Sequence, residues 1–264
     1  MVFLAIAEIL LSLYISIWRE AFYNAIVERN LHDFSIQTAI FTGVALLWCF
    51  VAGISGYLMT LCAIKWREIL NAKALAMDLP KILNANQRVQ DDCFAYPDLY
   101  LSLMVGVGKN IGYVLVFTTA LLWAFPWYYT VIIYIYSILG TFLIKWVASP
   151  LIKLNYDSQQ AEATYRNNLN FQNFSQCIKI MLGMAKKQKH LSYVQNFYGQ
   201  LGVVLPLLLV VPIYFTTDMT VGALMRFKAT AGIVIDSLAY GANSFGLINK
   251  LLACRKRLKE INLI

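Results

Sequence analysis

Charged side chains are scarce in this sequence. Asp, Glu, Lys and Arg make up only 14% of its 264 residues, and 59% are hydrophobic, whereas an ordinary soluble domain is about 25% charged. So little charge cannot coat a water-facing surface, and the bilayer is the solvent that suits the apolar excess. The length predicts a single transmembrane domain over residues 1–264, without a nucleotide-binding domain.

Histidine is scarcer still, and the five cysteines do not pair in sequence. His32 and His190 lie far apart, and no two cysteines form a CxxC motif. These absences argue against a metal site, a disulfide framework and a Ser–His–Asp or Cys–His catalytic group. We therefore expect no enzymatic activity and no cofactor.

The net charge of +8 raises the question of nucleic-acid binding. The Lys and Arg side chains form no patch interleaved with aromatic residues, and they stand between apolar runs, as in cytoplasmic loops. We expect no nucleic-acid partner. Residues 106–110 (GVGKN) are similar to the end of a P-loop, but Leu103 and Asn110 replace the Gly and the Ser or Thr that the pattern requires.

Long apolar runs are what the sequence has in abundance. Each run approaches or exceeds the roughly 20 residues that cross about 30 Å of hydrocarbon. Only helices satisfy their own backbone hydrogen bonds over such lengths in lipid. The expected fold class is therefore an all-α membrane protein with six transmembrane helices. The predicted spans are residues 1–18, 34–64, 99–125, 127–149, 191–217 and 229–249.

The basic residues predict the orientation. Of the 22 Lys and Arg residues, 17 lie within residues 65–88, 145–189 and 250–259, and six spans place these segments on one side. The positive-inside rule puts that side, with both termini, in the cytoplasm. The polar connections 65–98 and 150–190 predict long cytoplasmic helical extensions, which are typical of exporter-type transport domains.

Three ionisable residues lie inside the predicted spans. Glu8 and Lys109 stand near span ends, where their side chains either reach the interface or line a polar pathway. Asp236 lies deeper, and a charge there costs at least about 2.5 kcal/mol unless it meets water or a partner. We therefore favour a cavity-lining role for Asp236.

Small and polar residues form a stripe on the last predicted span. Their spacing of three and four residues puts them on one helix face, which indicates either a packing seam or a cavity lining. The stripe consists of Gly232, Asp236, Ala239, Asn243, Gly246 and Lys250.

Several stretches resemble a known transporter family. Residues 18–26 (WREAFYNAI) are similar to its W-x3-FYdaL segment, and residues 159–166 (QQAEATYR) to its qqrxEAxyR motif. Residues 65–67 (KWR) and 243–245 (NSF) match two further short patterns. The NpdQRixeD signature of the first cytoplasmic loop is matched by Asn86, Gln87, Arg88, Asp91 and Asp92. On these residues the chain resembles the SbmA/BacA peptide transporters and the related transmembrane domains of SbmA-like and peroxisomal-type ABC transporters.

The resemblance implies a six-helix exporter-type (type IV ABC-like) domain that works as a homodimer in a bacterial inner membrane. It also implies proton-driven uptake of peptides or peptide-like antibiotics. Glu162 matches a family glutamate and is the expected proton carrier, unless it only pairs with Arg166 on the same helix. The family usually has an acidic residue where Lys250 stands, so Asp236 would have to replace it in the proton pathway.

Two other functions stay open at this stage. The chain is also consistent with the permease subunit of an ABC transporter whose ATPase is a separate chain. Residues 86–92 and 150–190 would then be docking surfaces for that ATPase. The third hypothesis is a truncated, non-transporting paralogue, because the chain starts inside the first core helix of the family.

Overall fold

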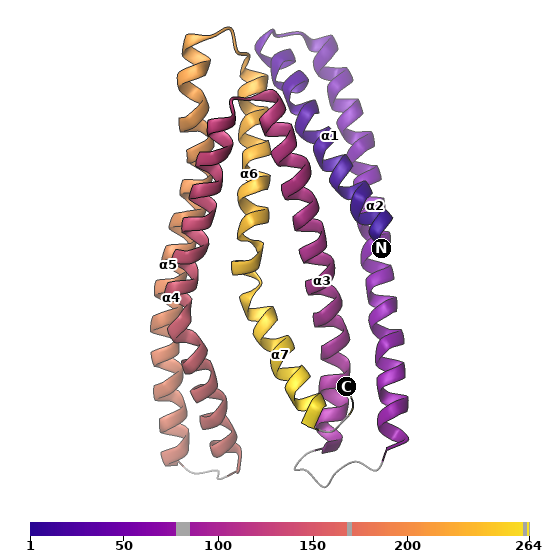
Figure 1. Cartoon of the computed structure of the whole chain (residues 1–264), viewed down its shortest axis with the longest axis vertical. Helices are drawn as coiled ribbons and strands as arrows, with labels where there is room; N and C mark the ends of the chain where they lie inside the picture. Colours follow the sequence, from indigo (N-terminus) through magenta and orange to yellow (C-terminus); the bar gives the residue numbers. More distant parts are fainter. Residues whose placement is uncertain (78–84, 168–170, 261–262, 264) are drawn as a thin grey trace.

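The computed structural model describes residues 1–77, 85–167, 171–260 and 263, and these form an all-helical bundle (Figure 1). Six of its helical segments are long and apolar enough to cross a membrane, so the predicted six-helix membrane fold is confirmed. The sixth consists of two helices that meet at Ser244. The helices are α1 (Val2–Val27), α2 (Leu31–Leu75), α3 (Ala85–Ala124), α4 (Trp127–Asn167), α5 (Phe171–Thr216), α6 (Val221–Asn243) and α7 (Phe245–Glu260).

Four helices are much longer than a bilayer requires. The lengths of α2, α3, α4 and α5 are 45, 40, 41 and 46 residues, which correspond to about 60–70 Å at 1.5 Å per residue. Since the hydrocarbon core is about 30 Å thick, these helices extend well beyond it. All four reach the lower end of the bundle in Figure 1, whereas α1 begins at mid-height.

Short turns join the helices at the upper end of the bundle (Figure 1). Between α1 and α2, Arg29 has a left-handed backbone with φ of 54°. Asn30 then caps α2, because its side-chain oxygen accepts a hydrogen bond from the Asp33 backbone N–H at 3.2 Å. Trp18 fastens the same two helices lower down by donating its indole N–H to the Gln37 carbonyl at 2.9 Å.

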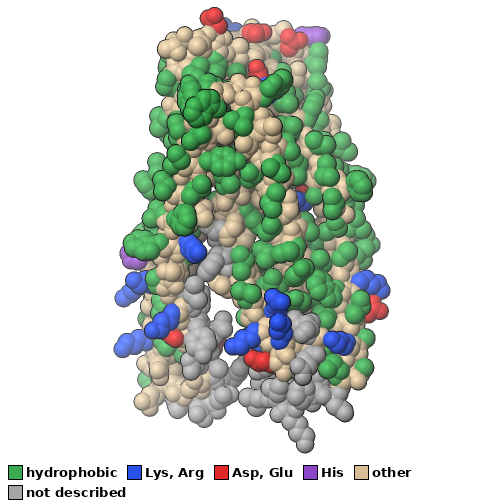
Figure 2. All heavy atoms as spheres, viewed as in Figure 1, with side chains coloured by type: hydrophobic (Ala, Val, Ile, Leu, Met, Phe, Trp, Pro, Cys, Tyr) green, Lys and Arg blue, Asp and Glu red, His purple; other side chains and the backbone are tan. Residues whose placement is uncertain are grey.

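The side chains divide the visible surface into two zones. In Figure 2, hydrophobic side chains cover the upper and middle part, and most Lys and Arg side chains gather toward the lower end. Acidic side chains mark the upper rim. This distribution agrees with a lower end in the cytoplasm, and the orientation itself stays a prediction.

Buried apolar residues form three clusters. The upper one centres on Phe117, Ile133, Val210 and Phe227 and so joins α3, α4, α5 and α6. Below it, one cluster joins α2, α3 and α7, and another joins only α4 and α5. The lower halves of α4 and α5 therefore pack on each other and stand apart from α7 (Figure 1).

Candidate functional site

A pocket of about 220 Å³ lies between α4, α5 and α6. One face of α6 supplies half of its lining, and α5 supplies most of the remainder. The α6 residues are Lys228, Gly232, Ile235, Asp236, Ala239 and Asn243. Four of them belong to the predicted stripe, while Gly246 and Lys250 lie beyond the break at Ser244 and do not line this pocket.

On the α4–α5 side of the pocket, Tyr198 of α5 packs closely against two residues of α4. The ring of Tyr198 stacks on Tyr136 with centroids 4.7 Å apart, and the Tyr136 hydroxyl donates to the Tyr198 carbonyl at 2.5 Å. The same ring lies directly over Gly140, in space that any Cβ would occupy. Glycine at position 140 thus allows Tyr198 to reach α4.

The pocket contains one basic and one acidic side chain. Lys228 and Asp236 both line it, and neither has an ion-pair partner within the described part of the chain. Asp236 and Asn243 are exposed in the single chain. A charged side chain in a membrane span normally meets water, a partner or a ligand, so the arrangement suits a polar solute.

The structure brings Glu8 and Lys109 together, which the sequence did not predict. The Lys109 Nζ donates to both carboxylate oxygens of Glu8, at 2.8 and 2.7 Å. The Glu8 side chain is only 8% exposed and that of Lys109 22%. The interpretation that both side chains reach the interface is therefore wrong, because each finds its counter-charge across the α1–α3 contact.

Further polar contacts join α1 to α6. The Ser16 and Thr230 hydroxyls, both buried, lie 2.7 Å apart and join α1 to α6. Nearer the upper end, Arg226 donates to Glu20 at 2.9 Å. Thus α1, α3 and α6 are joined by paired charges and hydroxyls, away from the α4–α5 side.

The remaining predicted residues lie on the helical extensions. Glu162 on α4 and Lys250 on α7 are exposed, and neither lines the α4–α5–α6 pocket. Asp92 is buried on α3 and accepts two hydrogen bonds from Arg257 of α7, at 2.8 and 2.6 Å. Asp91 beside it is exposed. The side chains of Asn86, Gln87, Arg88 and Arg166 lie outside the described residues.

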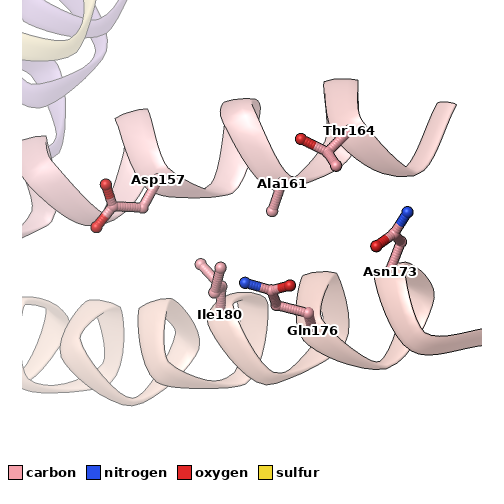
Figure 3. Close-up of a pocket in the computed structure, with 6 residues that line it drawn as sticks. All are labelled: Asp157, Ala161, Thr164, Asn173, Gln176 and Ile180. Carbon is pink, nitrogen blue, oxygen red and sulfur yellow. The ribbon is translucent and has the colours of Figure 1, made fainter. Parts of the chain in front are cut away.

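A second pocket, of about 350 Å³, lies between the lower halves of α4 and α5. Figure 3 shows three α4 side chains facing three α5 side chains across it. Most of the lining is small or polar, and no sequence motif or spacing indicated this pocket. The lining residues are Asp157, Ala161, Thr164, Asn173, Gln176 and Ile180.

Comparison with known proteins identifies the family. The family described as ABC transporter transmembrane region 2 matches residues 1–170. The chain is 27% identical over 273 residues to an uncharacterized ABC transporter ATP-binding protein of Haemophilus influenzae, covering 84% of this chain and 46% of that protein. It is 22% identical over 298 residues to the inner membrane ABC transporter ATP-binding protein YddA of Escherichia coli, covering 93% and 53%.

A eukaryotic relative matches a shorter stretch. ABC transporter D family member 3 of Dictyostelium discoideum is 30% identical over 136 residues, which cover 49% of this chain and 18% of that protein. The chain spans about half the length of the two bacterial relatives. These names support the ABC side of the predicted resemblance and do not single out the SbmA/BacA branch. The chain belongs to the ABC transporter transmembrane region 2 family, as a multi-pass membrane protein of the transporter type.

Proposed function

We propose that this chain forms the translocation pathway of an inner-membrane ABC-type transporter, driven by ATP hydrolysis on an ATPase domain that docks at the lower end of the bundle. The observation that carries this is the match to the membrane-spanning family together with bacterial relatives named as ATP-binding proteins. The helical extensions of α2 to α5 would carry the motion between the ATPase and the α6 pocket.

A homodimer is part of the proposal. The lower half of α5 exposes an apolar stripe outside the predicted span of residues 191–217, where lipid would not cover it. Phe171 is 84% exposed and Leu182 is 59% exposed, with Phe174 and Ile178 between them on the same face. A second copy of the chain would bury this stripe, because exposed apolar faces in water mark interaction surfaces.

A second candidate function is uptake of peptides or peptide-like antibiotics driven by the proton gradient. What favours it is Asp236, a carboxylate that lines the pocket with no counter-charge among the described residues. Glu162 is exposed on α4, and Glu8 is held by Lys109. Proton coupling would therefore depend on Asp236 first and on Glu162 second.

Reconstitution separates the candidates. The purified chain is placed in proteoliposomes with and without an imposed pH gradient, and with and without a co-purifying ATPase plus ATP. Uptake or efflux of a labelled peptide that needs ATP supports the first candidate. Movement that needs only the pH gradient, and that Asp236→Asn abolishes, supports the second. Absence of movement under both conditions would favour a non-transporting paralogue and count against both.

A further inference from the structure

Two opposite charges stand on one face of α6 inside the same pocket. Lys228 and Asp236 are eight residues apart and both line it. At 1.5 Å per residue, their Cα atoms are about 12 Å apart along the helix axis. The face between them therefore carries a positive end, a neutral middle and a negative end.

Two other charged residues of α3 and α6 have ion-pair partners on α1. Arg226 pairs with Glu20 at 2.9 Å, and Lys109 pairs with Glu8 at 2.7 Å. Lys228 and Asp236 have no such partner within the described residues. A charged membrane residue normally meets water, a partner or a ligand, and two opposite charges that share one pocket point to a ligand that supplies both counter-charges.

The wall between the two charges suits an extended backbone. Gly232 lies one turn from each charge, and Gly199 and Gly202 face it from α5. Without side chains, these positions let a ligand approach the helix backbones closely. An extended peptide advances about 3.3–3.6 Å per residue, so about 12 Å corresponds to the length of a peptide of roughly four residues.

We propose that the α4–α5–α6 pocket binds a zwitterionic solute, with its anionic end at Lys228 and its cationic end at Asp236, whose Cα atoms are about 12 Å apart along the helix axis. The inference rests on the proposed transport function, for which it supplies the recognition step. Lys228 and Asp236 would then determine specificity, and Lys228 lies in none of the sequence motifs.

The first test uses the unmodified protein and varies the ligand. Binding of tritiated tetra-alanine to the purified full chain in detergent is competed with unlabelled peptides. Tetra-alanine should compete at least about tenfold better than its N-acetylated or C-amidated forms, because each blocked form leaves one pocket charge unpaired. Dialanine, too short to reach both charges, should also compete weakly. Equal competition by all four peptides would overturn the proposal.

The second test varies the protein. Asp236→Asn should weaken tetra-alanine binding about tenfold or more but leave binding of the N-acetylated peptide unchanged, since that peptide has no cationic end. Lys228→Gln should do the same for the C-amidated peptide. Asp218→Asn and Lys187→Gln, at exposed positions away from the pocket, serve as matched controls. Equal losses for free and blocked peptides would show that the residues support the fold and do not read the charges.

Binding and transport fail separately in this design. If binding is charge-selective but neither ATP nor a pH gradient drives transport, the binding site is supported and the proposed transport function is rejected. Transport of tetra-alanine and both blocked peptides at equal rates would keep the proposed function and reject the charge-reading site.

Discussion

The two sides of α6 differ in whether their charged side chains have partners on neighbouring helices. Toward α1 and α3, charged and hydroxyl groups meet in pairs: Arg226 with Glu20 on α1, and Thr230 with Ser16. Toward α4 and α5, Lys228 and Asp236 line a pocket without a counter-charge among the described residues. The side of α6 that faces α1 thus has paired polar groups. The side that faces α4 and α5 has two charged side chains that remain available to a ligand.

The difference also concerns how the bundle is held together. Each interhelical ion pair that the structure describes joins α1, α3, α6 or α7 to another of these four. The α4–α5 pair is held by apolar packing and by Tyr136 and Tyr198. The ion pairs oppose separation of the helices they join, whereas in their lower halves α4 and α5 pack on each other and have, among the described residues, no such link to the other helices. We therefore expect α4 and α5 to move during transport while the ion-paired helices stay together.

The strongest test of this comparison breaks the Glu8–Lys109 pair. Glu8→Gln leaves Lys109 without its counter-charge in the α1–α3 seam, and we expect a loss of about 3 kcal/mol in the free energy of unfolding. The double variant Glu8→Gln/Lys109→Met should recover most of the loss, because no charge is then left unpaired. Unfolding in mixed micelles by SDS titration, followed by tryptophan fluorescence, measures both.

Glu28→Gln is the matched control for this prediction, since Glu28 is exposed at the end of α1. It should change stability by less than about 0.5 kcal/mol. The description of a charge pair would be contradicted if the double variant lost as much stability as the Glu8→Gln and Lys109→Met single variants do in sum.

The sequence was informative where the signal was local. Runs of apolar residues predicted six spans because each span must satisfy its backbone within itself. Spacing along α6 brought Gly232, Asp236, Ala239 and Asn243 onto one face, and all four line the pocket. Lys228 was missed, although it lies four residues before Gly232 and extends the same stripe, because the last predicted span begins at residue 229.

Contacts between distant segments could not be predicted in this way. Glu8 and Lys109 are 101 residues apart, and no periodicity along one helix shows which residue of another helix it will meet. Gly246 and Lys250 of the predicted stripe do not line the pocket, for a different reason. The helix breaks at Ser244, and the spacing rule holds only while the helix is continuous.

A second prediction concerns the lower end of the ion-paired group. Arg257→Leu removes both hydrogen bonds to Asp92, whose side chain is only 5% exposed. We expect a loss of about 2 kcal/mol and faster amide hydrogen exchange throughout α7. Arg255→Leu, at an exposed position on the same helix, should leave exchange in α7 unchanged. Equal exchange in the two variants would mean that apolar packing alone holds α7 on α3.

A third prediction examines the apolar seam. The Cβ added by Gly140→Ala would overlap the ring of Tyr198, so α4 and α5 must separate or the ring must turn away. We expect a loss of about 1 kcal/mol and weaker ligand binding in the neighbouring pocket. Gly183→Ala on α5 meets nothing within 4 Å and should be neutral or slightly stabilising. If the two variants behaved alike, the close α4–α5 contact at Tyr198 would not be important.

The smallest expected effect comes from the hydroxyl pair between α1 and α6. The Ser16 and Thr230 oxygens are 2.7 Å apart and buried, yet hydrogen bonds between membrane helices average only about 0.6 kcal/mol in double-mutant cycles. A cycle of Ser16→Ala and Thr230→Val, measured by the same SDS titration, should give a coupling of about that size. The cycle is needed because Thr230 also donates to the Arg226 carbonyl at 2.8 Å, and the Thr230 variant alone removes both contacts. A coupling near zero would show that this hydroxyl contact does not stabilise the α1–α6 contact, and the contrast between the two sides of α6 would then rest on the Arg226–Glu20 ion pair.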